Sequence, residues 1–103
     1  RIKRISQGLK GEPGVRILHD LPKWNYIQAL LSLGDRRVGK LLSVVHRREG
    51  NWSQALKEVA LNADFFVYRN KPFSEVLPWD FIETATPRAH LEREYQKALA
   101  QVL

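Results

Sequence analysis

A Gly-Asp step at residues 34–35 separates two segments in which apolar residues recur with helical spacing. Four such residues mark one face of each segment: Trp24, Ile27, Leu30 and Leu31 before the step, and Val38, Leu41, Leu42 and Val45 after it. Gly34 is a typical helix stop, and Asp35 can cap the helix that follows. A connection this short predicts an αα-hairpin or a helix-turn-helix corner. Gly39, inside the second helix, costs about 1 kcal/mol relative to alanine, so we expect another helix to approach closely there.

Further helical patterns lie on both sides of this corner. Ile2, Ile5 and Leu9 predict that the chain opens in the last turns of a helix. Asp20 is the expected N-cap of the helix before the corner, and Pro22 suits its first turn. Three more elements are predicted: a helix capped by Asn51 that runs through Val59, a brief turn from Asp64, and a last helix from Thr86-Pro87 to Val102.

Residues 15–19, Val-Arg-Ile-Leu-His, have the alternating β-branched pattern of a short strand. The chain holds no second strand to pair with this one, so we expect it to join a sheet elsewhere. The chain also begins at Arg1 and contains no methionine, which leads us to expect a piece of a longer protein. The predicted fold class is therefore mainly α, a small module of four to five helices with one short N-terminal strand.

The segment Leu77-Pro78-Trp79-Asp80-Phe81-Ile82 places many apolar side chains beside a single charge. Pro78 fixes its own φ and keeps Leu77 out of the helical region, so the chain bends there. We expect Trp79 and its apolar neighbours to be buried as a plug between helices, with Asp80 accepting bonds from nearby backbone N–H groups. On this interpretation Trp79→Ala lowers the stability by about 3–5 kcal/mol.

Several kinds of chemistry are excluded by composition. The chain has no cysteine, which excludes disulfides, thiolate metal sites and cysteine nucleophiles. Its three histidines lie far apart, without the spacing of metal ligands, and no glycine-rich loop is present to hold a phosphate. No apolar run approaches the ~18 residues of a membrane span, and we expect a cytoplasmic protein. Residues 1–71 hold fourteen Lys/Arg against six Asp/Glu, whereas residues 72–103 hold three against five. The basic charge therefore lies in the first two thirds of the chain.

Arg36 and Arg37 follow Asp35 at the expected start of the second helix, where cations oppose the helix macrodipole. Two interpretations stay open. The arginines bind a phosphate, a carboxylate or a nucleic-acid backbone, or they form a structural bridge to Asp35, Asp64 or Asp80. Adjacent helical residues point about 100° apart, so the two arginines cannot face the same partner. Arg37 falls nearer the apolar stripe, and we expect it to be the more buried, paired with Asp64 or Asp80.

Two motifs follow one another in the chain: Leu-Gly-Asp-Arg-Arg-Val-Gly at residues 33–39 and Glu-Val-Leu-Pro-Trp-Asp-Phe-Ile at residues 75–82. The pair His19-Asp20 and the residue Trp24 precede the first motif. This succession resembles the C-terminal part of a radical S-adenosylmethionine protein family, whose members have an N-terminal cobalamin-binding-like domain and a central iron–sulfur barrel. In that family the last barrel strand ends in a His-Asp pair, and a helical extension carries the two motifs. Phe81 departs from the pattern, because the family usually has His at this position.

The resemblance implies that residues 1–21 are the last helix and strand of the barrel, and that residues 22–103 are a C-terminal helical module bracing or covering it. An iron–sulfur cluster and S-adenosylmethionine, with or without cobalamin, are then expected upstream, with no metal, cofactor or catalytic residue in this chain. The resemblance also marks the residues expected on the substrate side or in a structural role: His19, Asp20, Asp35, Arg36, Arg37, Trp79 and Asp80.

Two other classes of function stay open. A basic helical module would contact RNA or DNA through its cations, which are Arg36, Arg37, Lys40, Arg47 and Arg48. Few aromatic residues lie among these cations, which disfavours stacking on a single strand. We therefore prefer the upstream barrel to nucleic acid as the partner, and expect no membrane partner. The third class is a scaffold that docks on another protein.

Overall fold

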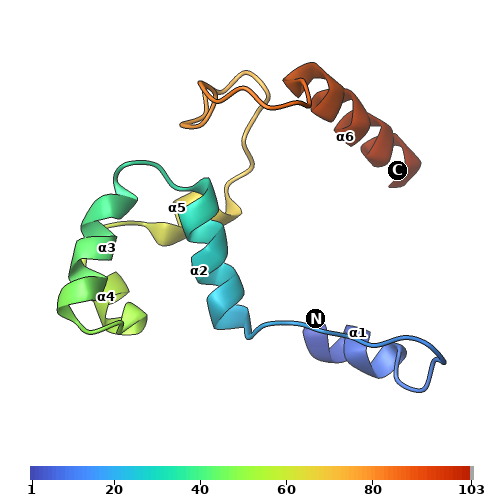
Figure 1. Ribbon diagram of the computed structural model, residues 1–103, viewed down its shortest axis with the longest axis horizontal. Helices are drawn as coiled ribbons and strands as arrows, with labels where there is room; N and C mark the ends of the chain where they lie inside the picture. Colours follow the sequence, from blue (N-terminus) through green and yellow to red (C-terminus); the bar gives the residue numbers. More distant parts are fainter. Residues whose placement is uncertain (103) are drawn as a thin grey trace.

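The computed structural model describes residues 1–102, which form six helices and no strand (Figure 1). The helices are α1 (Ile2–Gly8), α2 (Pro22–Leu33), α3 (Val38–Arg47), α4 (Trp52–Glu58), α5 (Ala63–Tyr68) and α6 (Arg88–Val102). The prediction of a mainly helical chain is confirmed, although the helices number six rather than four to five.

The expected strand at residues 15–19 is not formed in the described part of the chain. This segment forms no ladder, because a strand needs a hydrogen-bonded neighbour and none exists in the described part of the chain. Asp20 does not cap α2 either. Leu21 occupies the N-cap position without a side-chain bond, and Pro22 is the first helical residue, as predicted.

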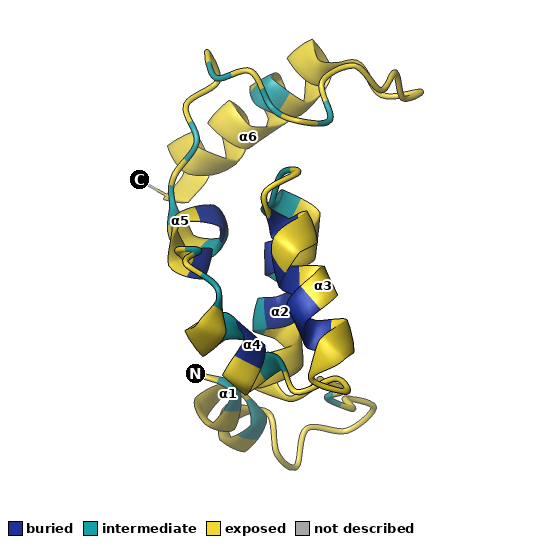
Figure 2. Ribbon diagram, turned by 90° about the vertical axis from the view of Figure 1, so that its left-hand side faces the viewer, coloured by how far each residue is buried: buried dark blue, intermediate teal, exposed yellow. Residues whose placement is uncertain are grey.

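The core lies among α2, α3, α4 and α5. Eight buried residues form it: Leu30, Val38, Leu41, Val44, Val45, Ala55, Ala63 and Phe66. Figure 2 shows their faces turned inward, whereas α1 and α6 carry no buried residue. The predicted face of α3 needs one correction, because Val44 is buried and Leu42 is 45% exposed. The apolar face therefore centres on Leu41, Val44 and Val45.

The corner between α2 and α3 requires glycine. The N–H of Gly34 bonds to the carbonyl of Leu30 at 2.9 Å and closes α2. A Cβ on Gly34 would lie 2.7 Å from that same oxygen and would clash with Cγ2 of Val38. Gly39 differs, since a Cβ there would meet nothing within 4 Å. The expected close approach of another helix at Gly39 is therefore wrong.

Asparagine side chains start the two short helices that follow. Asn51 accepts a bond from the N–H of Gln54 at 3.1 Å, which confirms the predicted cap of α4. Asn62 accepts in the same way from the N–H of Phe65 at 3.3 Å. The brief turn predicted from Asp64 is therefore a capped helix that begins at Ala63.

Two arms extend from this core, residues 1–21 with α1 and residues 72–102 with α6 (Figure 1). The radius of gyration is 17.8 Å, whereas a compact domain of this length has about 13 Å. Apolar side chains on both arms are exposed: Ile5, Leu9, Val15, Leu18 and Leu21 on the first, and Leu91, Tyr95, Leu99 and Val102 on the second. The arms therefore present apolar surface that the core does not cover.

Candidate functional site

The Gly-Asp-Arg-Arg corner and the Leu-Pro segment, distant in sequence, line one small pocket of about 120 Å³. We call it the corner pocket. Its lining residues are Leu33, Asp35, Arg37, Phe65, Phe66, Arg69, Lys71, Glu75, Val76, Leu77 and Pro78. The end of α2, the turn before α3, the helix α5 and the segment that leaves α5 all contribute to it. Of the residues that the sequence marked, Asp35 and Arg37 lie here.

Asp35 and Arg37 form a closed pair at the mouth of the turn. The backbone N–H of Arg37 donates to Oδ1 of Asp35 at 2.9 Å, and its Nη2 donates to Oδ2 at 2.7 Å. These bonds from Arg37 hold the pKa of the Asp35 carboxyl below its usual value. The Arg37 guanidinium also lies 4.9 Å from the ring centroid of Phe66, in a cation–π contact.

The expected pairing of Arg37 with Asp64 or Asp80 is therefore wrong, and its partner is Asp35, one of the structural bridges that the sequence left open. Neither Asp64 nor Asp80 contacts Arg37, whose side chain is 58% exposed. The cause is the turn, which keeps residues 35–37 ahead of α3. The N–H of Val38 bonds to Asp35 O and that of Gly39 to Arg36 O, so Arg37 is free to fold back on Asp35. Asp35 thus closes the turn, but the N-cap position of α3 belongs to Arg37.

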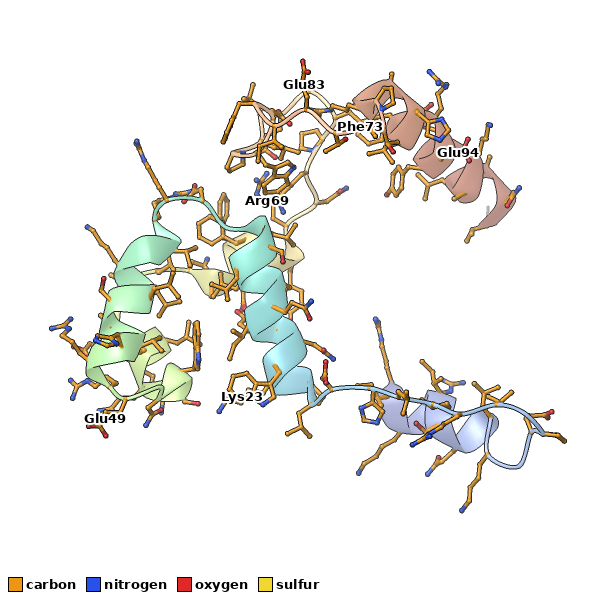
Figure 3. All side chains as sticks on the ribbon, viewed as in Figure 1. Lys23, Glu49, Arg69, Phe73, Glu83 and Glu94 are labelled. Atoms are coloured by element: carbon orange, nitrogen blue, oxygen red, sulfur yellow. The ribbon has the colours of Figure 1, made fainter. Side chains whose placement is uncertain are left out.

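A second ion pair, which the sequence analysis missed, lies deeper in the corner pocket. Arg69 donates to Glu75 at 2.7 Å, and its guanidinium lies 4.6 Å from the ring centroid of Phe65. Figure 3 shows Arg69 where the chain leaves α5. Two buried atoms of this pair, Nε of Arg69 and Oε2 of Glu75, have no hydrogen-bond partner among the described residues. Nζ of Lys71 donates to the carbonyl of Phe66 at 3.2 Å.

The cationic side chains that line the corner pocket are all bonded to other groups of the chain. Both arginines are bonded to carboxylates, and the lysine is bonded to a backbone oxygen. No serine, cysteine or histidine lines the pocket, so no side-chain nucleophile is paired with a base there. The pocket therefore joins the segment at residues 75–78 to the α2–α5 core.

A larger pocket, of about 660 Å³, lies between the loop at residues 77–87 and the start of α6, and we call it the loop pocket. Asp80 organises it. Its Oδ2 accepts from the N–H of Leu77 at 2.7 Å and from Arg88 at 3.0 Å. The expectation that Asp80 accepts backbone N–H bonds is therefore confirmed.

The buried plug predicted around Trp79 is wrong. Trp79 is only partly buried and lines the loop pocket, and Phe81 is 84% exposed. The loop is bonded to α6 through Asp80 and Arg88, and Phe73, which precedes the loop, meets Tyr95 of α6 edge to face. Pro87 precedes α6, which starts one residue later, at Arg88. Trp79 is therefore not buried between helices, and part of its apolar surface stays exposed.

The remaining residues marked by the sequence do not join either pocket. His19 and Asp20 lie in the extended segment before α2, where Nδ1 of His19 is 3.0 Å from the Asp20 carbonyl oxygen. Arg36 is exposed at the corner and lines neither pocket. The structure thus brings Asp35 and Arg37 together at the corner pocket and Trp79 and Asp80 together at the loop pocket, and leaves His19, Asp20 and Arg36 apart from both.

The described residues contain no group of three or more His, Asp or Glu side chains placed to hold a metal ion, and the chain has no cysteine. Within residues 1–102, no helix has the length and apolar character needed to cross a membrane. Comparison with models of protein families, with curated proteins and with solved structures found no match to this chain.

Proposed function

We propose that this chain is the C-terminal helical module of a radical S-adenosylmethionine iron–sulfur protein. In the intact protein the module packs against the barrel and braces or covers it, and the reaction takes place in the barrel. The chain itself is a packing module without catalytic groups.

The observation that carries this proposal is the meeting of the two motifs in the corner pocket. Asp35 and Arg37 come from the first motif, and Leu77 and Pro78 from the second. About forty residues separate them in the sequence, and α3, α4 and α5 lie between. The resemblance rests on these motifs in this order, and residues of both motifs line the same pocket.

The exposed apolar side chains of the arms support a large protein partner. On α6, Leu91, Tyr95 and Leu99 follow one another at intervals of four residues and are all exposed. Patches of this kind mark interaction surfaces in soluble proteins. The first arm, residues 1–21, is the part that the resemblance assigns to the barrel, so the partner and the module are expected to be continuous there.

The residues of this chain do not fit an iron–sulfur cluster, because such clusters are held by cysteine thiolates and the chain has none. In this proposal the cluster and S-adenosylmethionine are held entirely by the upstream barrel. The contribution of the module is to fix the position of the loop at 77–87 relative to the core. The Arg69–Glu75 pair holds the segment before the loop against the end of α5, and the Asp80–Arg88 pair joins the loop to α6.

Hydrogen–deuterium exchange, compared between the full-length protein and the isolated chain, tests the proposal. The full-length protein, purified without oxygen, should contain iron and sulfide and cleave S-adenosylmethionine. Amides of residues 15–21 and 88–102 should exchange at least tenfold more slowly in the full-length protein. The double variant Leu91→Gln/Leu99→Gln should lose the protection of α6, whereas Lys97→Gln, a matched change on the same helix, should keep it.

The family assignment and the packing of the arms on the barrel can each be refuted independently of the other. A full-length protein without a cluster contradicts the radical S-adenosylmethionine assignment. Equal exchange of the arms in both forms contradicts packing on the barrel. Protected arms in a protein without a cluster favour docking on a different domain.

A further inference from the structure

One side of α3 carries a row of cations that the core does not use. Arg36, Lys40, Ser43 and Arg47 follow at spacings of four, three and four residues, and all four are exposed. We call this row the α3 stripe. At 100° per residue, Lys40, Ser43 and Arg47 lie within about 60° of one another, on the side of α3 away from Leu41 and Val45, and Arg36 lies in the turn just before the helix. In Figure 3, side chains with nitrogen ends extend from α3 on the side away from α2.

The α3 stripe is free of internal ion pairs. Arg37 and Arg48, which the sequence analysis grouped with it, are bonded to Asp35 at 2.7 Å and to Glu58 at 2.8 Å. Arg36, Lys40 and Arg47 make no hydrogen bond or ion pair to any side chain within residues 1–102. Asp35 and Glu58 are thus bonded to Arg37 and Arg48, and Arg36, Lys40 and Arg47 are exposed without an ion pair within residues 1–102. Glu49, two residues after Arg47, is the one acid near the row that forms no ion pair there.

We infer that the α3 stripe binds the phosphate backbone of a nucleic-acid duplex. From Lys40 to Arg47 a helical rise of 1.5 Å per residue spans about 10 Å, and Arg36 lies beyond the start of the helix in the preceding turn. Phosphates on one strand of a duplex recur about every 3.4 Å along the axis, so each of the three cations can meet a different phosphate. This inference is independent of the proposed function, because the α3 stripe lies outside both motif pockets.

The chemistry of α3 favours a duplex over the other polyanions. A single strand is usually bound by stacking its bases on aromatic side chains, and α3 contains no aromatic residue. A helix that lies on a membrane inserts an apolar face beside its cations. The apolar face of α3 is already buried in the core, where Val38, Leu41 and Val44 are at most 7% exposed. Contacts to phosphate alone make the binding independent of base sequence.

Fluorescence anisotropy with a labelled RNA duplex of 20 base pairs, and with a DNA duplex of the same sequence, tests the inference. Three phosphate contacts give a slope of about −2.7 for log Kobs against log salt concentration. Binding should therefore weaken about 40-fold between 50 and 200 mM salt. The triple variant Arg36→Gln/Lys40→Gln/Arg47→Gln should flatten the slope to near zero. Circular dichroism should show unchanged helix content, since all three side chains are exposed.

Two controls separate the α3 stripe from net charge. Lys3→Gln/Arg4→Gln/Lys10→Gln removes the same charge from the first arm and should leave the slope within about 0.5 of the original. Arg36→Lys/Lys40→Arg/Arg47→Lys keeps the row of charges and should keep the slope. Equal loss in both glutamine triples would overturn the inference in favour of non-specific attraction. Stripe-dependent binding to anionic phospholipid vesicles or oligouridine, with no binding to either duplex, would also overturn it.

Discussion

Replacing Gly34 with alanine tests the account of the corner between α2 and α3. The added methyl group would lie 2.7 Å from the carbonyl oxygen of Leu30 and would clash with Cγ2 of Val38. Ordinary van der Waals contacts of a carbon atom lie near 3.5–4.0 Å, so the neighbours must move by about 1 Å. Neither neighbour moves freely. Leu30 O accepts the bond that closes α2, and Val38 is a buried β-branched residue with a restricted χ1.

The expected loss of stability follows from this crowding. Overpacking in a well-packed site costs typically 1–3 kcal/mol. Gly34 adopts φ −76° and ψ 171°, which alanine also adopts, so backbone strain adds nothing. We therefore expect Gly34→Ala to lower the free energy of unfolding by about 1–3 kcal/mol.

Gly39 provides the matched control, because the same substitution five residues later meets open space. Gly39→Ala should raise the stability by roughly 0.5–1 kcal/mol, as alanine is the better helix former. Urea denaturation followed by circular dichroism at 222 nm measures both changes against the parent chain. Two variants that shift the midpoint in the same direction by similar amounts would refute the packing argument, since only one of the two sites is crowded.

Three other predictions concern the core, the loop and a titrating tyrosine. Leu41→Ala should lower the free energy of unfolding by about 2–5 kcal/mol in the same denaturation assay. Leu99→Ala, on the exposed face of α6, should lower it by less than about 1 kcal/mol. Trp79→Ala should also cost less than about 1 kcal/mol, which separates a partly exposed loop residue from the buried plug. Burial, followed by its hydrogen bond to Asp64, raises the pKa of Tyr26 from 10.0 to about 12. The resulting stability is complete below pH 10 and is lost as the pH rises through 12, so Tyr26→Phe should make melting temperatures less sensitive to pH in that window.

The elements that the sequence predicted well depend on local signals. Pro22 begins α2, Gly34 ends it and Asn51 caps α4, because these residues act on their own backbone or on a residue three positions away. The apolar spacing on either side of residue 34 predicted the two helices, although Trp24, Leu31 and Leu42 of the predicted faces are 48%, 46% and 45% exposed. Such signals do not depend on how distant parts of the chain pack, and the sequence therefore contained them.

The errors arose where a residue needed a distant partner. The apolar content of the loop around Trp79 indicated burial, but it could not indicate what would cover the loop, and the core does not. The strand at residues 15–19 failed for the same reason, since it lacks a neighbouring strand. Arg37 was expected to reach Asp64 or Asp80, yet a carboxylate two residues away is reached at a smaller entropic cost.

The second ion pair of the corner pocket shows what the sequence analysis missed. Arg69 and Glu75 are six residues apart and outside any helix, so no helical spacing connects them. The available signal was the aromatic pair just before Arg69, because arginine commonly stacks on aromatic rings. Phe65 and Phe66 together contact both arginines of the pocket. An arginine placed three residues after such a pair is a candidate for this kind of anchoring.

The apolar surface of the arms and the α3 stripe lie in different parts of the molecule, so barrel packing and duplex binding can be tested together. Figure 1 shows α1 and α6 on one side of α2, and α3 on the other. A barrel that covers the apolar side chains of the arms would therefore leave the α3 stripe open to solvent. We expect the full-length protein to bind a duplex with the same salt slope as the isolated chain, while exchange in α6 is slowed. If packing of the arms abolished duplex binding, the two surfaces would overlap, and the arrangement of partners on opposite sides of α2 would be wrong.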